Sequence, residues 1–196
     1  MRIEGGRKVL RVGGVIQSVH VDETYEPDVW DAMLPDPPER RPERVLILGL
    51  GGGTMAQLLT ARYGPIEITG VERDPAVIWL ARHEFGLATL PHVRIVEDDA
   101  FAFVRTAAER GVRYDAICVD LYTAGKMAHG VFDPAFLRDV ARILAPVGAA
   151  TFNLWRSPYL ADQLRRLRRA LRVAAVVAVE DNLVVHCRSL ERDGKA

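Results

Sequence analysis

The segment from Arg44 to Asp74 constrains the fold of this chain more than any other. Its apolar run Val45–Leu48 is typical of a fully buried parallel strand, and a second apolar run, Ile66–Val71, ends at Glu72. Between them lies a glycine cluster, at Gly49, Gly51, Gly52 and Gly53. Glycines let the backbone approach a ligand closely, and the free N–H groups of the next helix favour a polar or anionic ligand. An acid about twenty residues further on accepts hydrogen bonds from ribose hydroxyls, so the segment predicts a site for an adenosine-containing molecule.

The size and charge of the chain limit the classes of protein to which it can belong. Its 196 residues suffice for one domain with a full core, and a hydrophobic content of 49% indicates a globular protein. The formal net charge of zero gives no general electrostatic reason to bind nucleic acid or a membrane. No signal peptide opens the chain and no apolar run approaches the roughly 20 residues of a membrane span, so a cytoplasmic protein is expected.

The cysteines and histidines do not indicate a metal site. Cys118 and Cys187 lie inside apolar runs, which is typical of buried, reduced thiols. The five histidines show no metal-ligand spacing, so no metal is expected.

The first 43 residues predict a β-hairpin and a linker. Two strand-like runs, Lys8–Val12 and Val15–Val19, are joined by Gly13-Gly14, and a proline-rich segment, Pro35–Pro42, follows a short amphipathic stretch. An exposed hairpin is compatible with a homodimer. Residues 44–196 then form the predicted nucleoside-binding α/β domain.

From Arg44 onward the pattern alternates between strands and helices. Strands are predicted at about 44–49, 66–72, 93–96, 114–120 and 148–154, and helices at about 54–63, 75–84, 99–110, 133–144 and 158–171. Such alternation predicts a parallel sheet with right-handed crossovers. The last two β-rich runs, Val173–Val179 and Leu183–Cys187, are too close for a crossover and predict an antiparallel hairpin. The expected fold class is therefore a methyltransferase-like α/β Rossmann sandwich, mostly parallel, with a terminal antiparallel hairpin.

The candidate site follows from the rule that ligands bind beyond the carboxyl ends of parallel strands. The glycine loop, Glu72, Asp98, Asp99 and Asp120 all lie at or just past predicted strand ends. We expect Glu72 to bind ribose and Asp99 to accept from an adenine amino group, to cap the next helix, or both. Gly49-x-Gly51-x-x-Thr54 departs from the dinucleotide fingerprint at its third glycine and is weak evidence for NAD.

Two other segments have alternative interpretations. The long connection 121–132 is a lid, with Gly125 and Gly130 as hinges and polar contacts from Tyr122, Lys126 and His129, or a simple mobile loop. The arginines between 165 and 172 alternate with leucines at helical spacing, which favours a solvated helix face over a nucleic-acid site.

Five ordered segments together resemble the spermidine synthase (polyamine aminopropyltransferase) family. They are VGGVIQSVHVDETYEPDVWDAML (12–34), VLILGLGGGT (45–54), GVERDPAVI (70–78), VEDDAFAFV (96–104) and YDAICVDLYTAG (114–125). The resemblance implies transfer of the aminopropyl group of decarboxylated S-adenosylmethionine to a diamine. By position it assigns ligand contacts to Gln17, Glu72, Asp99 and Asp120, with Asp120 also the candidate catalytic residue. Gly49, Gly51, Gly53 and Asp98 complete the expected nucleoside site.

The chain departs from the family pattern at two acids. Gly52 stands where the family has an Asp that contacts the aminopropyl amine, and Thr123 stands where it has the Asp that acts as general base. Glu23 and Glu26 are possible substitutes if the N-terminal segment folds over the crevice. Three functions therefore stay open: an aminopropyltransferase-like enzyme without its usual base, a methyltransferase that uses intact S-adenosylmethionine, and a non-catalytic nucleoside-binding relative. The expected partners are a small nucleoside and an amine acceptor.

Overall fold

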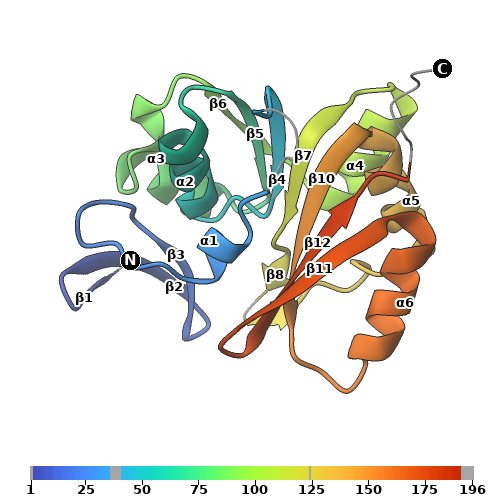
Figure 1. Ribbon diagram of the computed structural model, residues 1–196. Coiled ribbons are helices and arrows are strands. Elements are labelled where there is room, and N and C mark those ends of the chain that lie inside the picture. Colours follow the sequence, from blue (N-terminus) through green and yellow to red (C-terminus); the bar gives the residue numbers. More distant parts are fainter. Residues whose placement is uncertain (1, 36–40, 124, 191–196) are drawn as a thin grey trace.

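The computed structural model describes residues 2–35, 41–123 and 125–190. A seven-stranded sheet forms its centre, in the order β11-β12-β10-β7-β4-β5-β6 (Figure 1). Its strands are β4 (Arg44–Leu48), β5 (Glu67–Glu72), β6 (Val93–Glu97), β7 (Tyr114–Val119), β10 (Leu144–Trp155), β11 (Arg172–Val179) and β12 (Asn182–Arg188). β12 runs antiparallel to both of its neighbours, whereas the remaining pairs are parallel. The predicted parallel sheet with a terminal antiparallel hairpin is confirmed.

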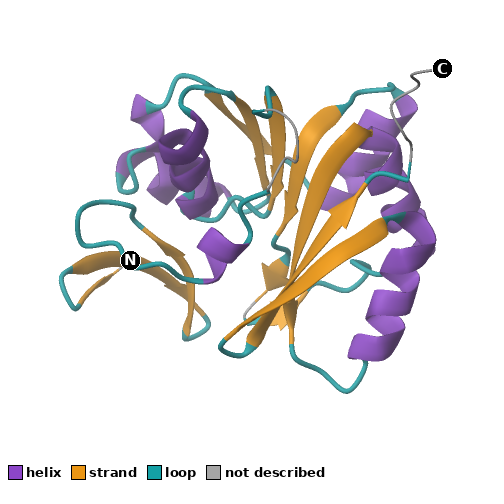
Figure 2. Ribbon diagram, in the orientation of Figure 1, coloured by secondary structure: helices purple, strands orange, loops and turns teal. Residues whose placement is uncertain are grey.

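Helices cover both faces of this sheet (Figure 2). They are α2 (Thr54–Tyr63), α3 (Pro75–His83), α4 (Ala100–Glu109), α5 (Pro134–Ile143) and α6 (Leu160–Ala170), with a 3-10 turn η1 (Leu87–Thr89). β4 shows why two cores form, because successive side chains of a strand point to opposite faces. Val45 and Ile47 pack in the cluster that contains α2 and α3, whereas Leu46 and Leu48 pack in the cluster that contains α4, α5 and α6. The result is a three-layer sandwich.

The N-terminal segment forms a small sheet and docks against the larger unit. The expected hairpin is present as β2 (Arg7–Val12) and β3 (Val15–Val19), and β1 (Arg2–Glu4) adds a third strand that the sequence did not predict. The short helix α1 (Val29–Ala32) follows, and Thr151 of β10 donates its hydroxyl to the carbonyl of Met33 at 2.9 Å. Of the proline-rich linker, residues 36–40 lie outside the described residues.

Three local features differ from the sequence prediction. β10 begins at Leu144, directly after α5, and its pairing with β7 shifts register before Ala149. The connection 121–132 contains two short paired strands, β8 (Tyr122–Thr123) and β9 (Lys126–Met127). Asp74 caps α3 through the N–H of Ala76, but Asp133, in the same position before a proline, makes no side-chain capping bond.

Candidate functional site

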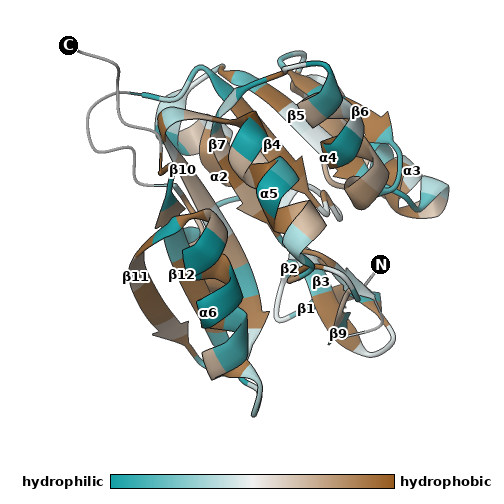
Figure 3. Ribbon diagram, turned by 90° about the vertical axis from the view of Figure 1, so that its right-hand side faces the viewer, coloured by the Kyte–Doolittle hydropathy of each residue, from teal (hydrophilic) through white to brown (hydrophobic). Residues whose placement is uncertain are grey.

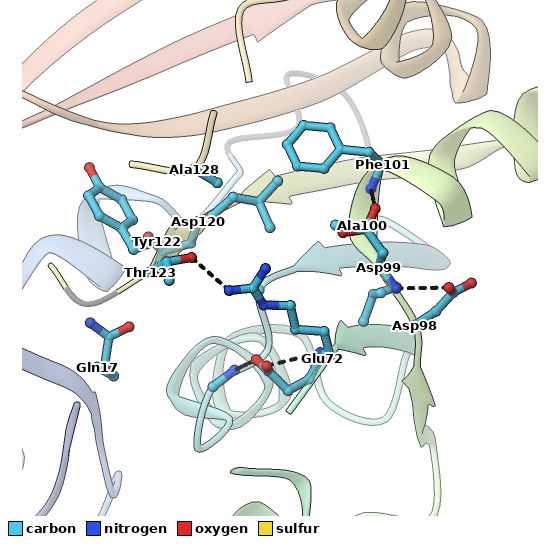
Figure 4. Close-up of a pocket in the computed structure, with 15 residues that line it drawn as sticks. Gln17, Glu72, Asp98, Asp99, Ala100, Phe101, Asp120, Tyr122, Thr123 and Ala128 are labelled. Carbon is cyan, nitrogen blue, oxygen red and sulfur yellow. Dashed lines mark hydrogen bonds between the residues drawn. The ribbon is translucent and has the colours of Figure 1, made fainter. Parts of the chain in front are cut away.

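An open cleft lies at the carboxyl ends of β4, β5, β6 and β7 (Figure 4). It brings together the predicted contacts Gln17, Gly49, Gly51, Glu72, Asp98, Asp99 and Asp120. Gly53 is the exception: it does not line the cleft but begins α2 with φ of +94°, against the side chain of Leu87. This left-handed turn and the close approach of the Leu87 side chain both require a glycine at position 53. In this structure Gly53 therefore positions the start of α2.

The glycine loop is held tightly against the strand that ends at Asp120. At Gly49, φ is +85° and a β-carbon would lie 2.1 Å from the main-chain oxygen of Asp120, so no side chain fits there. The N–H of Gly51 donates to Oε2 of Glu72 at 3.0 Å. These contacts join the ends of β4, β5 and β7 into one rigid floor.

Three main-chain amides fix the carboxylate of Glu72. Besides Gly51 on Oε2, the N–H groups of Arg73 and Asp74 donate to Oε1 at 2.9 and 3.1 Å. A carboxylate oxygen accepts more than one hydrogen bond, so Glu72 keeps acceptor capacity toward the cleft. This arrangement fixes the orientation of the Glu72 carboxylate and leaves it able to accept further hydrogen bonds from a ligand.

The two acids after β6, Asp98 and Asp99, accept hydrogen bonds from nearby main-chain N–H groups and also line the cleft. Oδ1 of Asp99 accepts the N–H groups of Phe101 and Ala102 at 3.0 and 3.1 Å, which is an N-cap for α4. Oδ1 of Asp98 accepts the N–H of Asp99 at 2.8 Å. The expected capping role of Asp99 is therefore observed, and it uses one of the two carboxylate oxygens.

Asp120 is held by two donors from distant parts of the chain. The indole N–H of Trp30 donates to Oδ2 at 3.1 Å, and the amide of Asn153 donates to Oδ1 at 2.9 Å. Burial raises the pKa of Asp120, and these two hydrogen bonds oppose that rise because they stabilise the ionised form. Asn153 is itself oriented by the amide of Asn182, which donates to its Oδ1 at 2.8 Å.

A second, open cavity adjoins the cleft and shares Gln17, Asp120 and Tyr122 with it. Two further carboxylates and two indole rings line it, from Asp28, Glu180, Trp30 and Trp155. The sequence prediction missed this set, because α1 and the β11–β12 turn come from opposite ends of the chain. Asp28 and Asp31 are spaced as a capping box, a signal that could have located the start of α1 but not the partner against which this helix packs. The suggested substitutes do not line the cavity: Glu23 is exposed, and Glu26 pairs with Arg7 at 3.3 Å.

The positions that depart from the family pattern have their own contacts. The N–H of Gly52 donates to the hydroxyl of Ser18 at 2.6 Å, and a β-carbon at Gly52 would lie 2.9 Å from Cβ of Ser18. Thr123 accepts a hydrogen bond at 2.9 Å from the guanidinium of Arg73, and both residues line the cleft. The cleft therefore carries a cationic group beside a position where the family places an acid.

The connection after Asp120 is only partly irregular. Tyr122 and Thr123 line the cleft, whereas Lys126 and His129 do not. The N–H of Ala128 donates to the carbonyl of Leu121 at 2.8 Å, which closes the β8–β9 turn against the end of β7. Gly125 and Gly130, the expected hinges, both have positive φ, and residue 124 lies outside the described residues.

Among the described residues, no helix is long and apolar enough to cross a membrane. No cluster of three or more His, Cys, Asp or Glu side chains suited to a metal ion occurs within those same ranges.

Residues 1–178 match the spermine/spermidine synthase domain family. The chain belongs to this family. Among curated relatives, the polyamine aminopropyltransferase of Vibrio vulnificus is 29% identical over 122 residues, which cover 62% of this chain and 41% of the relative. An eEF1A lysine and N-terminal methyltransferase homolog of Drosophila pseudoobscura is 27% identical over 174 residues, covering 81% and 25%. The chain thus spans less than half the length of these relatives.

Solved structures support the methyltransferase-like fold of this family member. Human methyltransferase-like protein 13 in complex with SAH superposes with a TM-score of 0.75 and 25% identity, over 87% of this chain and 85% of that one. The family therefore shares its scaffold with methyltransferases, and the fold alone does not choose between the two chemistries.

Proposed function

We propose that this chain is a transferase that binds S-adenosylmethionine, or its decarboxylated form, in the cleft and transfers a group to an amine in the second cavity. One observation carries the proposal: Asp120 lines both cavities. A reacting carbon in the cleft and an attacking nitrogen in the second cavity would be brought together beside this carboxylate.

Each part of the nucleoside has a matching group in the cleft. Glu72 accepts from the ribose hydroxyls, and Asp99 accepts from the adenine amino group. Gly49 and Gly51 let the ligand approach the main chain closely. Gln17, which lies between the two cavities, contacts the transferred group.

The second cavity suits a protonated or freshly deprotonated amine. The carboxylates of Asp28 and Glu180 attract an ammonium group, and Trp30 and Trp155 add aromatic side chains to the wall around it. In the reaction the amine nitrogen forms a bond to the carbon attached to sulfur. The carbon–sulfur bond breaks and its electron pair stays on the sulfur, which becomes a neutral thioether. The nitrogen releases a proton, for which Asp120 is the nearest candidate acceptor, and its raised pKa favours that role.

Titration calorimetry tests the nucleoside site with S-adenosylmethionine, its decarboxylated form and methylthioadenosine. We expect micromolar-range binding of at least one, weakened tenfold or more in Glu72→Ala, since a hydrogen bond to a charged group contributes about 1.5–3 kcal/mol. Glu97→Ala is the matched control, because Glu97 pairs with Glu72 in the sheet and is exposed but does not line the cleft. Absence of binding for all three ligands would exclude both transferase functions.

Methyl transfer is the second candidate, and the guanidinium of Arg73 favours it. A guanidinium pairs well with a carboxylate, and only intact S-adenosylmethionine carries one. Gly52 and Thr123 also lack the acids that would hold an aminopropyl amine. We therefore expect Arg73→Gln to reduce the preference for intact over decarboxylated S-adenosylmethionine. The mass added to the acceptor amine distinguishes a methyl from an aminopropyl group, and binding without turnover of any amine would favour the non-catalytic function.

A further inference from the structure

Asn182 is linked to Asp120 through one intermediate side chain. Its Nδ2 donates to Oδ1 of Asn153 at 2.8 Å, and Nδ2 of Asn153 donates to Oδ1 of Asp120 at 2.9 Å. All three side chains line the second cavity. They form a relay of two amides that ends on the carboxylate proposed to accept the proton.

Strand pairing brings the two amides together. Asn182 begins β12, which lies between β10 and β11 in the large sheet (Figure 3). Asn153 of β10 pairs with Val184, so Asn182 is its diagonal neighbour, two residues earlier on the same face of β12. Both asparagines belong to the regular ladder, and the sheet therefore holds the relay in place.

The charge of Asp120 dictates the direction of the relay. An ionised carboxylate accepts hydrogen bonds and donates none, so the amide of Asn153 has to turn its nitrogen toward Asp120 and its carbonyl oxygen toward Asn182. Asn153 is only 7% exposed, and a buried carbonyl oxygen needs a donor. Asn182 supplies that donor. In the opposite orientation the carbonyl oxygen of Asn153 would face a carboxylate oxygen, and Asp120 would lose a hydrogen bond.

We propose that Asn182 is a positioning residue for the transfer reaction: by donating to Asn153, it keeps the nitrogen of that amide turned toward Asp120. The proposal rests on the proposed function, in which Asp120 takes the proton that the amine releases. Asn182 acts only through Asn153, because the two printed hydrogen bonds are its connection to the carboxylate. Loss of the donor lets the Asn153 amide turn over and leaves the carboxylate of Asp120 without a fixed orientation on the side of β10.

A double-mutant cycle in urea tests the relay without any substrate. We expect Asn182→Ala to raise the unfolding equilibrium constant at pH 7 about threefold more in the wild-type background than in Asp120→Asn, because a neutral amide at position 120 pairs with either orientation of Asn153. In an Asn153→Ala background this difference should vanish, since Asn182 and Asp120 are then no longer connected.

Gln163→Ala is the matched control for this cycle. It removes a carboxamide of α6 that lines neither cavity, so its effect on unfolding should be the same with and without Asp120→Asn. Equal effects of Asn182→Ala in the two backgrounds, or a difference that survives Asn153→Ala, would overturn the proposal.

The isosteric variant Asn182→Asp separates the donor from the space that the side chain fills. Its ionised carboxylate keeps the shape of the asparagine but cannot donate to Asn153. We expect it to lower the urea midpoint at pH 7 at least as far as Asn182→Ala does. A midpoint equal to that of the wild type would show that the donor is not needed and would overturn the proposal.

Kinetic measurements test whether the relay serves the reaction. With S-adenosylmethionine and 1,4-diaminobutane as the amine probe, Asn182→Ala should lower kcat about tenfold and leave the KM for S-adenosylmethionine within about twofold, because Asn182 does not line the nucleoside cleft. An unchanged kcat would overturn the proposal. Absence of turnover in the wild type would count against the proposed function with this amine, whereas the unfolding cycle would still decide whether Asn182 positions Asp120.

Discussion

The substitution Gly49→Ala should lower the free energy of unfolding by more than the replacement of an ordinary turn glycine by alanine does. An alanine at φ of +85° has backbone strain of about 1–2 kcal/mol. Its β-carbon would also lie 2.1 Å from the main-chain oxygen of Asp120. That oxygen cannot retreat easily, because the N–H of Asp120 is bonded to Leu48 at 2.9 Å and the N–H of Gly49 to Val71 at 3.0 Å. Relieving such a contact adds about 1–3 kcal/mol.

The variant Gly111→Ala separates the backbone strain from the cost of the close contact made by the added β-carbon. Gly111 has φ of +66° but no atom within 4 Å of an added β-carbon, so only the backbone strain applies. The stabilisation that alanine gives by restricting the unfolded chain is the same in both variants and cancels in the comparison. We therefore expect Gly49→Ala to lose about 1–3 kcal/mol more than Gly111→Ala.

Urea denaturation monitored by circular dichroism measures this difference, provided that the slope of unfolding free energy against urea concentration is the same in both variants. Gly49→Ala should also weaken nucleoside binding at temperatures where it remains folded, because the displaced main chain carries the carboxylate of Asp120 with it. Equal destabilisation in the two variants would refute the argument that the close approach between β4 and β7 shapes the cleft.

The remaining predictions concern buried polar groups. Asn153→Ala removes a bond to ionised Asp120 and should raise its pKa further. A folded-state pKa above the unfolded value, about 3.9 for Asp, means that stability is fully present below that value and lost as pH rises through the folded pKa. The gap in unfolding free energy between wild type and variant should therefore widen as pH rises through the folded-state pKa of Asp120, by about 1.5–3 kcal/mol; a constant gap would contradict the bond. Burial raises the pKa of both Cys118 and Cys187 to about 12, so neither should react with a thiol reagent at pH 8 until the protein unfolds; rapid labelling of the native chain would refute this.

The fold was predictable where local signals and tertiary packing agree. The helix starts at Thr54 and Pro75 match their sequence signals, and the apolar run at β4 lies in the sheet as expected. β1 could not be predicted, because three residues carry too little periodicity. The early start of β10 was also hidden, since Leu144 satisfies the apolar pattern of a helix end as well as that of a strand.

The site was predictable along the strand ends and unpredictable across the chain. The rule for parallel sheets places Glu72, Asp99 and Asp120 at one edge without knowledge of packing. It says nothing about the side chains that approach Asp120 from elsewhere, because Trp30 and Asn153 reach it only after α1 docks beside β10. Polar residues in such positions carry no periodic signal, so only the folded chain identifies them.

The same docking supplies the acceptor site that we propose in spite of the loss of two family acids. Gly52 has no space for an acid because Ser18 and Phe85 fill it, and Thr123 is bonded to Arg73. The carboxylates near Asp120 come instead from Asp28 and Glu180, on the opposite side from the nucleoside cleft. A cation would then be attracted to the acceptor side, whereas the cleft carries the guanidinium of Arg73 among the carboxylates of Glu72, Asp98 and Asp99. In the function that we propose, the carboxylate of intact S-adenosylmethionine pairs with Arg73, whereas the acceptor amine is held on the other side of Asp120 by Asp28 and Glu180.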